Sequence, residues 1–205
     1  MTEASALAEL LRPAIKSERV LAAIASVPRD RFVPAGERDR AYENVALPIG
    51  YGQTISQPLV VARMLELLEL RDSDRVLDVG TGSGYHAALL ALLAGEIWTI
   101  ERHADLSTEA ELAIRGLGIE NVGFAVGDGS RGLPDHAPFD AINVAAATGA
   151  SVPQAFQDQL APSGRLVAPV GVDGQRLTLI KRGPRRLEAT TLEPVRFVPL
   201  IVRDQ

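Results

Sequence analysis

The pattern of apolar and polar positions changes near residue 70 and predicts a different architecture on each side. Over residues 57–70, apolar side chains recur at the spacing of a helix that packs on one face. Residues 3–27 show similar spacing interrupted by Pro13, so they predict two short helices. Residues 28–55 are rich in proline, glycine and charge, and we expect an ordered connection with few regular elements.

From residue 75 onward, short apolar runs alternate with helical stretches. Strands that alternate with helices predict a parallel sheet covered on both faces. The last two runs have no helix between them, so we expect antiparallel β-structure at one edge of the sheet. The strands are expected at residues 75–80, 96–101, 121–126, 139–146 and 164–171, the helices at 87–94, 104–115 and 154–160, and the antiparallel edge at 175–182 and within 187–201.

These patterns predict an α/β fold in which two parts form one integrated domain. Residues 1–70 are expected to form a mainly helical cap, and residues 71–205 a doubly wound α/β unit. In such sheets, ligands bind outside the carboxyl ends of the strands, where the strand order reverses. Candidate chemistry is therefore expected at the ends of the predicted strands.

Composition and charge narrow the possible classes of protein. Hydrophobic residues make up 46% and charged residues 23% of the chain, which is typical of a globular protein. The formal net charge of −5 makes nucleic acid a less favoured partner. The lack of cysteine excludes disulfides and thiolate chemistry, and the charged N-terminus has no signal-peptide core. The longest apolar run is too short for a membrane span, so we expect a soluble cytoplasmic protein.

A glycine-rich turn, VLDVGTGSGYH at residues 76–86, separates a predicted strand from a predicted helix. Gly80, Gly82 and Gly84 allow the backbone to turn sharply and to approach a ligand without side chains in the way. The free N–H groups of the following helix would face the same ligand. Because the spacing also satisfies the dinucleotide pattern G-x-G-x-x-A, the turn by itself leaves the ligand open.

Three acidic residues at the ends of successive strands favour S-adenosylmethionine over a dinucleotide. Asp78 lies two positions before the first glycine, where a carboxylate attracts a cationic group and repels a pyrophosphate. Glu101 ends the second strand, where its carboxylate can accept hydrogen bonds from both ribose hydroxyls. Asp128 follows the third strand, within reach of an adenine amino group. Each acid alone is typical of a solvated turn, but three around one crevice indicate a binding site.

A distinctive stretch, AYENVALPIGYGQTISQP at residues 41–58, follows the segment PRDRFVP. Together with VLDVGTGSGY, GDGS, APFDAI, GRLVAPVG and VRFVPL, it resembles the protein-L-isoaspartate O-methyltransferase family along nearly the whole chain. The run GQTIS followed by proline is specific to that family, whereas the glycine turn is shared with distant relatives. The resemblance implies a Rossmann-like, doubly wound, seven-stranded sheet of the S-adenosylmethionine-dependent methyltransferase type, with a substrate-side loop in the cap.

The resemblance also implies a reaction. A methyl group would pass from S-adenosylmethionine to the free α-carboxylate of L-isoaspartyl residues in damaged proteins and peptides, which starts their repair and leaves S-adenosylhomocysteine. Such a carboxyl has a pKa of about 3.3–3.7, so it is ionised at neutral pH and needs no general base. Alignment of the reactants is then the main catalytic task, and no metal is expected. The implied partners are isoaspartyl proteins and peptides, bound transiently by a monomer, with no nucleic acid and no membrane.

The resemblance assigns site residues as well. Ser56 is the expected catalytic residue, whose hydroxyl orients the reacting carboxylate or the cofactor, although a serine before Gln57-Pro58 is also typical of a helix N-cap. The expected cofactor-binding residues are Asp78, Gly80, Thr81, Gly82, Gly84, Glu101, Arg102, Asp128 and Gly129, and the expected substrate-binding residues are Gln53, Thr54, Ile55, Ala145, Arg196 and Phe197.

Three features depart from the common family pattern. Ala145 and Thr148 stand where many relatives have threonine and proline, the helix after the glycine turn begins GYHAA where GYQTA is frequent, and the chain ends four residues after Ile201. We expect these changes to affect substrate range and efficiency more than reaction class. His86 and His103 lack partners at metal-ligand spacing, so both are expected at the surface or at helix caps.

Two alternatives remain beside the isoaspartyl reaction. The first is methyl transfer to another carboxylate or to a small molecule on the same scaffold, which the change at Ala145 keeps open. The second is a non-catalytic module that binds the cofactor or a partner. The presence of Asp78, Glu101, Asp128 and Ser56 together argues against this second alternative.

Overall fold

The computed structural model describes residues 1–202. The end of the chain, to which the expectation about a short tail refers, lies outside this range. Seven strands form its central sheet. Their bounds agree with the predicted strands to within a few residues at most ends. In chain order they are β3 (Arg75–Val79), β4 (Glu96–Glu101), β5 (Val122–Val126), β6 (Phe139–Val144), β7 (Leu160–Val170), β8 (Arg176–Arg182) and β9 (Leu187–Pro194).

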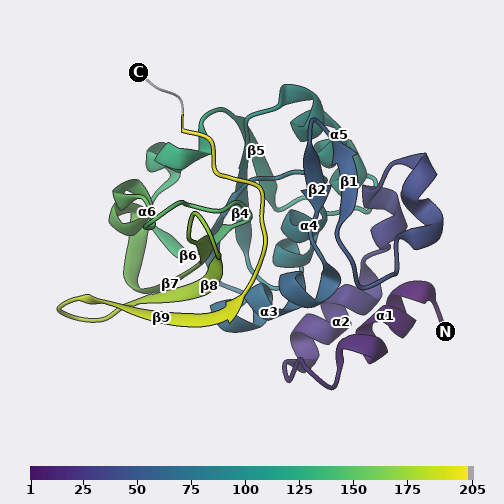
Figure 1. Ribbon diagram of the computed structural model, residues 1–205, viewed down its shortest axis with the longest axis horizontal. Helices are drawn as coiled ribbons and strands as arrows, with labels where there is room; N and C mark the ends of the chain where they lie inside the picture. The colour runs from purple at the N-terminus through teal and green to yellow at the C-terminus, as the bar shows by residue number, and fades with distance from the viewer. Residues whose placement is uncertain (203–205) are drawn as a thin grey trace.

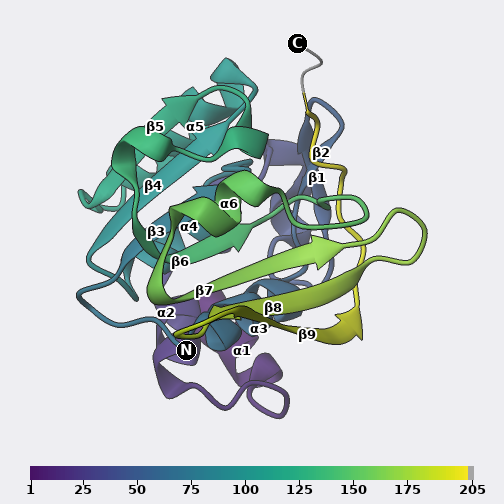
Figure 2. The same cartoon turned by 90° about the vertical axis from the view of Figure 1, so that its left-hand side faces the viewer.

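The strands are ordered β5–β4–β3–β6–β7–β8–β9 across the sheet (Figures 1 and 2). The strands from β5 to β7 run parallel, and β8 and β9 each pair antiparallel with the strand before them. The chain moves outward from β3 in one direction through β4 and β5, and then returns to β6 on the other side of β3. This switch point confirms the predicted doubly wound, Rossmann-like α/β fold and its antiparallel edge.

Helices cover the two faces of the sheet unequally. The helices are α1 (Glu3–Leu11), α2 (Glu18–Ser26), α3 (Pro58–Leu68), α4 (Tyr85–Ala91), α5 (Ala104–Arg115) and α6 (Gln154–Gln159). Neighbouring strand residues point to opposite faces, so Val76 joins the larger core cluster with α1 to α5 and Leu77 joins the smaller one with α6. Within residues 1–202, no helix has the length and apolar character needed to cross a membrane.

Two local features differ from the sequence expectation. Residues 28–55 contain a β-hairpin of β1 (Leu47–Gly50) and β2 (Gln53–Ile55), whose turn has positive φ at Gly50, Tyr51 and Gly52. Strands this short have too few alternating positions to be recognised from the sequence. Residues 195–202 form no strand and only a bridge between Ala147 and Pro199, because proline cannot donate to a sheet ladder.

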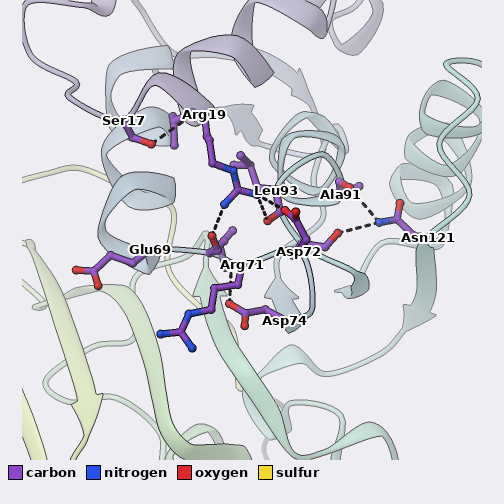
Figure 3. A network of polar contacts seen from close by, with 12 residues as sticks. Ser17, Arg19, Glu69, Arg71, Asp72, Asp74, Ala91, Leu93 and Asn121 are labelled. Carbon is purple, nitrogen blue, oxygen red and sulfur yellow. Dashed lines mark hydrogen bonds and ion pairs between the residues drawn. The ribbon is translucent and has the colours of Figure 1, made fainter.

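The N-terminal helices are attached to the sheet unit by side chains that reach backbone carbonyls. Figure 3 shows Arg19 of α2 donating to the carbonyl of Leu70 at 2.6 Å and to that of Leu93 at 3.2 Å, beside an ion pair with Asp72. On the far side of the same loops, Asn121 donates to the carbonyl of Ala91 at 3.0 Å. These bonds lie at the loops that enter β3, β4 and β5, so they hold α2 and the ends of α3 and α4 against the amino edge of the sheet.

Candidate active site

A cavity lies at the carboxyl ends of β3, β4 and β6, beneath the β1–β2 hairpin. This main cavity has an empty volume of about 840 Å³, part of it open to solvent. It occupies the switch point of the sheet, where ligands bind in doubly wound folds. Many of the predicted site residues line it, namely Gln53, Thr54, Ile55, Ser56, Gly80, Thr81, Gly82, Glu101, Arg102, Gly129 and Ala145.

The three glycines of the turn have different structural roles. Gly80 and Gly82, with φ of +94° and +52°, line the main cavity and bring bare backbone to it. Gly84 lies outside the lining, and a Cβ there would come within 2.9 Å of the Cβ of Ala110 on α5. The structure therefore gives Gly84 a packing role between the turn and α5, and its predicted ligand contact remains a prediction.

Asp78 also lies outside the cavity lining, fully buried beneath the turn. It is paired in register with Thr99 on β4 and Asn143 on β6, so the three polar side chains form one row across the central strands. Its Oδ1 accepts from Nδ2 of Asn143 at 2.7 Å and its Oδ2 from Oγ1 of Thr99 at 2.9 Å. Thr99 Oγ1 lies 2.6 Å from Oγ1 of Thr81, which does line the cavity. The acid therefore reaches the cavity through intervening side chains.

This burial makes the stability of the protein depend on pH through Asp78. Burial raises the pKa of Asp78 to about 6, although hydrogen bonds from Asn143 and Thr99 oppose the rise. A carboxyl with a raised folded-state pKa contributes most to stability below its unfolded pKa of about 3.9, and loses that contribution as pH rises through the folded value. The quantity to compare is the difference in the free energy of unfolding between the natural chain and the Asp78→Asn variant. We expect this difference to fall by about 2–3 kcal/mol between pH 4 and 6.5 and to stay constant at higher pH. Urea titrations across this range measure the difference, and a flat profile would contradict it.

Glu101 fastens the glycine turn to the end of β4. Its Oε2 accepts from the N–H of Gly82 at 2.9 Å, and its Oε1 accepts from the N–H groups of Arg102 and His103 at 2.8 and 3.1 Å. Only 6% of Glu101 is exposed, yet the residue lines the main cavity. Oε2 accepts only one of these bonds and retains capacity for another, so a preoriented acceptor faces the β4 end of the cavity.

Asp128 lies just outside the main cavity, in a neighbouring hollow that Arg102 and Ile201 also line. Its Oδ1 accepts from the backbone N–H and the hydroxyl of Ser130 at 3.0 and 2.7 Å. These bonds cap the short 3₁₀ turn at Gly129–Arg131 and bring Gly129 into the lining of the main cavity. The predicted adenine contact by Asp128 remains a prediction.

A second groove adjoins the main cavity on its outer side. It is lined by Ala46, Thr54, Ser56, Gln57, Val60, Ala145 and residues 194–199, which include Arg196 and Phe197. The N–H of Phe197 donates to Oε1 of Gln175 at 2.6 Å, and its carbonyl accepts from Nε2 of the same side chain at 3.0 Å. The Gln175 side chain thus holds Phe197 through both of its main-chain polar groups. Thr54, Ser56 and Ala145 line both the main cavity and this second groove.

Ser56 does not cap the helix that follows it, so the N-cap alternative is wrong. The N-cap position of α3 is Gln57, whose side chain makes no capping bond, and the N–H of Leu59 donates to Oδ1 of Asn44 at 3.0 Å. Because Asn44 lies 15 residues before Leu59, the sequence around Ser56 contained no sign of this cap. Ser56 is left at the junction of the two cavities.

Arg29 is a site-supporting residue that the sequence reasoning missed. It is fully buried, and its guanidinium donates to the backbone carbonyls of Ala41, Val45 at 3.1 Å and Ser56 at 3.1 Å. The ring of Tyr85 lies 5.8 Å from the guanidinium carbon, and burial lowers the pKa of Arg29 to about 10, so the group is charged at neutral pH. Its only sequence signal was its place within PRDRFVP. Arg29 fixes the backbone position of Ser56.

The expectation for His86 was wrong, because this residue is buried in the wall of the main cavity. Its Nδ1 lies 3.2 Å from Nδ2 of Asn143, and burial lowers its pKa to about 3, so the ring is neutral. His103 does occupy the N-cap position of α5, and its ring stacks on Tyr51 of the hairpin turn. Among residues 1–202, no group of three or more His, Cys, Asp or Glu side chains is placed to hold a metal ion.

Comparison with known proteins agrees with this geometry. Residues 2–205 match the family described as protein-L-isoaspartate(D-aspartate) O-methyltransferase (PCMT). The chain is 51% identical over 198 residues to the protein-L-isoaspartate O-methyltransferase of Aeromonas hydrophila, with 97% of this chain and 96% of the relative covered. It is 52% identical over 193 residues to that of Roseiflexus castenholzii, covering 94% and 88% of the two chains.

Solved structures give the same result. A protein-L-isoaspartate O-methyltransferase superposes with a TM-score of 0.86 at 28% identity, covering 95% of this chain, which spans 64% of that longer one. A Plasmodium falciparum structure described as a protein-L-isoaspartate O-methyltransferase, in complex with S-adenosyl-L-homocysteine, gives 0.85 at 26% identity and covers 98% and 99% of the two chains. With a family match along nearly its whole length and relatives at about half identity, the chain belongs to the protein-L-isoaspartate(D-aspartate) O-methyltransferase family.

Proposed function

We propose that this chain is an S-adenosylmethionine-dependent enzyme that methylates the free α-carboxylate of L-isoaspartyl residues in damaged proteins and peptides, which starts their repair. The observation that carries the proposal is that the main cavity and the second groove share Thr54, Ser56 and Ala145. A methyl donor in the first and an extended peptide in the second would meet at this common wall. Membership of the family supports both ligands.

The residues of the main cavity fit S-adenosylmethionine. At the β4 end, Glu101 is an oriented acceptor for ribose hydroxyls, and Arg102 and Gly129 border the space for the adenine. Gly80, Thr81 and Gly82 bring bare backbone to the centre. At the β6 end, His86 lines the cavity, and its buried Nε2 has no protein partner among the described residues. Such an atom in a mostly apolar wall is suited to a polar ligand or to ordered water.

The reaction requires the protein mainly to position the two reactants. When bound, S-adenosylmethionine supplies a methyl group on a cationic sulfur that leaves as a neutral thioether. Ser56 donates a hydrogen bond that orients the acceptor carboxylate, which is already ionised at neutral pH. Gln53, Thr54 and Ile55 form the adjoining wall, and Arg196 and Phe197 form the far side of the groove. Fixing two reactants in line contributes on the order of 7–11 kcal/mol to lowering a barrier.

The groove favours a partner that is read through its main chain and bound transiently. Damaged sites occur in many sequence contexts, so recognition by an open groove suits diverse protein and peptide partners better than a dedicated docking surface. The chain acts as a monomer in the cytoplasm, and the cap over residues 1–70 supplies the hairpin that closes the site while residues 71–205 supply the cofactor cavity.

Methyl transfer to a matched pair of peptides tests the proposed function. One peptide carries an isoaspartyl residue and its twin an ordinary aspartyl residue in the same sequence, and both are incubated with radiolabelled S-adenosylmethionine. We expect label only in the isoaspartyl peptide, as a base-labile methyl ester. Label in a small carboxylic acid but in neither peptide would favour a different acceptor at the Ala145 wall. Tight cofactor binding without transfer to any carboxylate would indicate a non-catalytic module.

A further inference from the structure

Among the described residues, one ring nitrogen of His86 has a hydrogen-bond partner and the other has none. Nδ1 lies 3.2 Å from Nδ2 of Asn143, whereas Nε2 is buried and has no hydrogen-bond partner among the described residues. The whole side chain is 7% exposed, and the residue lines the main cavity. A buried N–H or ring nitrogen without a partner costs free energy, so such a group in a cavity wall needs an explanation.

The hydrogen-bond network beneath the glycine turn fixes which nitrogen carries the proton. The carboxylate of Asp78 can only accept, so the amide of Asn143 must present its Nδ2 to Asp78 Oδ1 at 2.7 Å. The second hydrogen of the same amide nitrogen then points to His86 Nδ1, which must accept it. A neutral imidazole has a single N–H, and it therefore lies on Nε2. Asp78 thus sets His86 as a hydrogen-bond donor at Nε2.

The strand order places this donor at a defined end of the main cavity. Glu101 ends β4 on one side of β3, whereas Asn143, the partner of His86, lies on β6 on the other side. His86 lines the main cavity but not the second groove, in contrast to Ser56 and Ala145, which line both. A ligand with its ribose at Glu101 therefore extends its other end toward His86.

We propose that His86 Nε2–H donates a hydrogen bond to the carboxylate at the amino-acid end of S-adenosylmethionine and S-adenosylhomocysteine, held in the donor tautomer by Asp78 through Asn143. The inference rests on the proposed function for the identity of the ligand. A neutral donor suits this task, because it binds an anion without adding a positive charge beside the cationic sulfur. His86 is then a cofactor-binding residue, and Asp78 and Asn143 are positioning residues.

Two substitutions of His86 distinguish the role of Nε2 from that of Nδ1. His86→Gln places an amide nitrogen as many bonds from Cα as Nε2, so it restores the donor to the cavity. His86→Asn places its amide at the position of Nδ1, so it keeps an acceptor for Asn143 and removes the donor. Two probes, S-adenosylhomocysteine and 5′-methylthioadenosine, distinguish binding of the amino-acid end from binding of the nucleoside. Methylthioadenosine has the same thioether nucleoside but lacks the amino-acid end.

Calorimetric titration of the full chain with both probes tests the inference. We expect His86→Asn to weaken S-adenosylhomocysteine binding about ten- to hundredfold, as the loss of one hydrogen bond to a charged group predicts, with methylthioadenosine binding unchanged. His86→Gln should keep the natural affinity ratio of the two probes. Equal losses for both probes, or none, would overturn the inference, as would a raised peptide KM with unaltered S-adenosylhomocysteine binding.

A measurement on the natural chain covers the case in which the variants do not fold. Imidazole nitrogen NMR should show the Nε2–H tautomer for His86, and S-adenosylhomocysteine but not methylthioadenosine should shift that proton downfield. A proton on Nδ1, or equal shifts with both probes, would overturn the inference. If the natural chain binds no S-adenosylhomocysteine, the proposed function fails. If the natural chain binds S-adenosylhomocysteine and methylates isoaspartyl peptide, but substitution of His86 does not change the affinity ratio of the two probes, only this inference fails.

Discussion

Replacing Ser56 with alanine should lower kcat for isoaspartyl peptide methylation by about a hundredfold, the usual cost of losing one oriented hydrogen-bond donor at a reacting group. Ser56 lies at the junction of the main cavity and the second groove, and its side chain does not cap α3. The hydroxyl is therefore available to the reacting carboxylate. Initial-rate kinetics on the peptide measure the change, and S-adenosylhomocysteine affinity should change little.

A second serine separates the role of Ser56 from a general effect of the substitution. Ser26 is exposed in α2, and its hydroxyl donates only locally, to the carbonyl of Ala22 at 2.8 Å. Ser26→Ala should leave kcat unchanged. Both variants should keep the natural unfolding midpoint, because neither change opens a buried cavity or strands a buried polar group. Turnover by Ser56→Ala equal to that by Ser26→Ala would remove Ser56 from the mechanism.

Replacing Arg29 with methionine should lower the free energy of unfolding by about 2–4 kcal/mol and reduce turnover as well. The change relieves the cost of burying a charge that has no carboxylate partner among the described residues, but it leaves the carbonyls of Ala41, Val45 and Ser56 without their donor. Buried unsatisfied carbonyls cost about 1–3 kcal/mol each, so their loss outweighs the relief. Turnover falls because the backbone of Ser56 is no longer held.

Arg31 provides the matched control for this prediction. It lies in the same short 3₁₀ helix, Arg29–Phe32, but its side chain is exposed. Arg31→Met makes the same chemical change at the surface, where substitutions usually alter stability by less than about 0.5 kcal/mol. Urea denaturation of both variants gives the comparison. An Arg29→Met protein as stable as Arg31→Met would mean that water replaces the guanidinium at all three carbonyls.

The α/β class and most element bounds follow from the sequence, because period and composition are local properties. The helix predicted at 104–115 has the bounds of α5, and the predicted antiparallel edge is formed by β8 and β9. The prediction failed where elements were too short to carry a period, as in the β1–β2 hairpin. It also failed after β9, where Pro194 and Pro199 prevent a regular ladder.

The candidate site divides in the same way. The glycine turn, Glu101 and the run from Gln53 to Ser56 were identified from the sequence because their chemistry is carried by neighbouring residues. Asp78 and Gly84, also predicted to bind the cofactor, lie outside the lining of the main cavity, because position along a strand or turn does not reveal which residues pack inside. The register of β4, β3 and β6 places Asp78 between Thr99 and Asn143 in the interior. Gly84 packs closely against Ala110 of α5.

The sequence by itself therefore determined the fold class, the family resemblance and many of the residues that line the main cavity. Only the tertiary structure decided that Asn44 caps α3, that Arg29 holds the backbone of Ser56 and that His86 is buried beside Asn143. Each of these contacts joins residues at least 15 positions apart in the chain. Hydrogen bonding and burial at such separations depend on how the elements pack, and no local pattern of residue types encodes that packing.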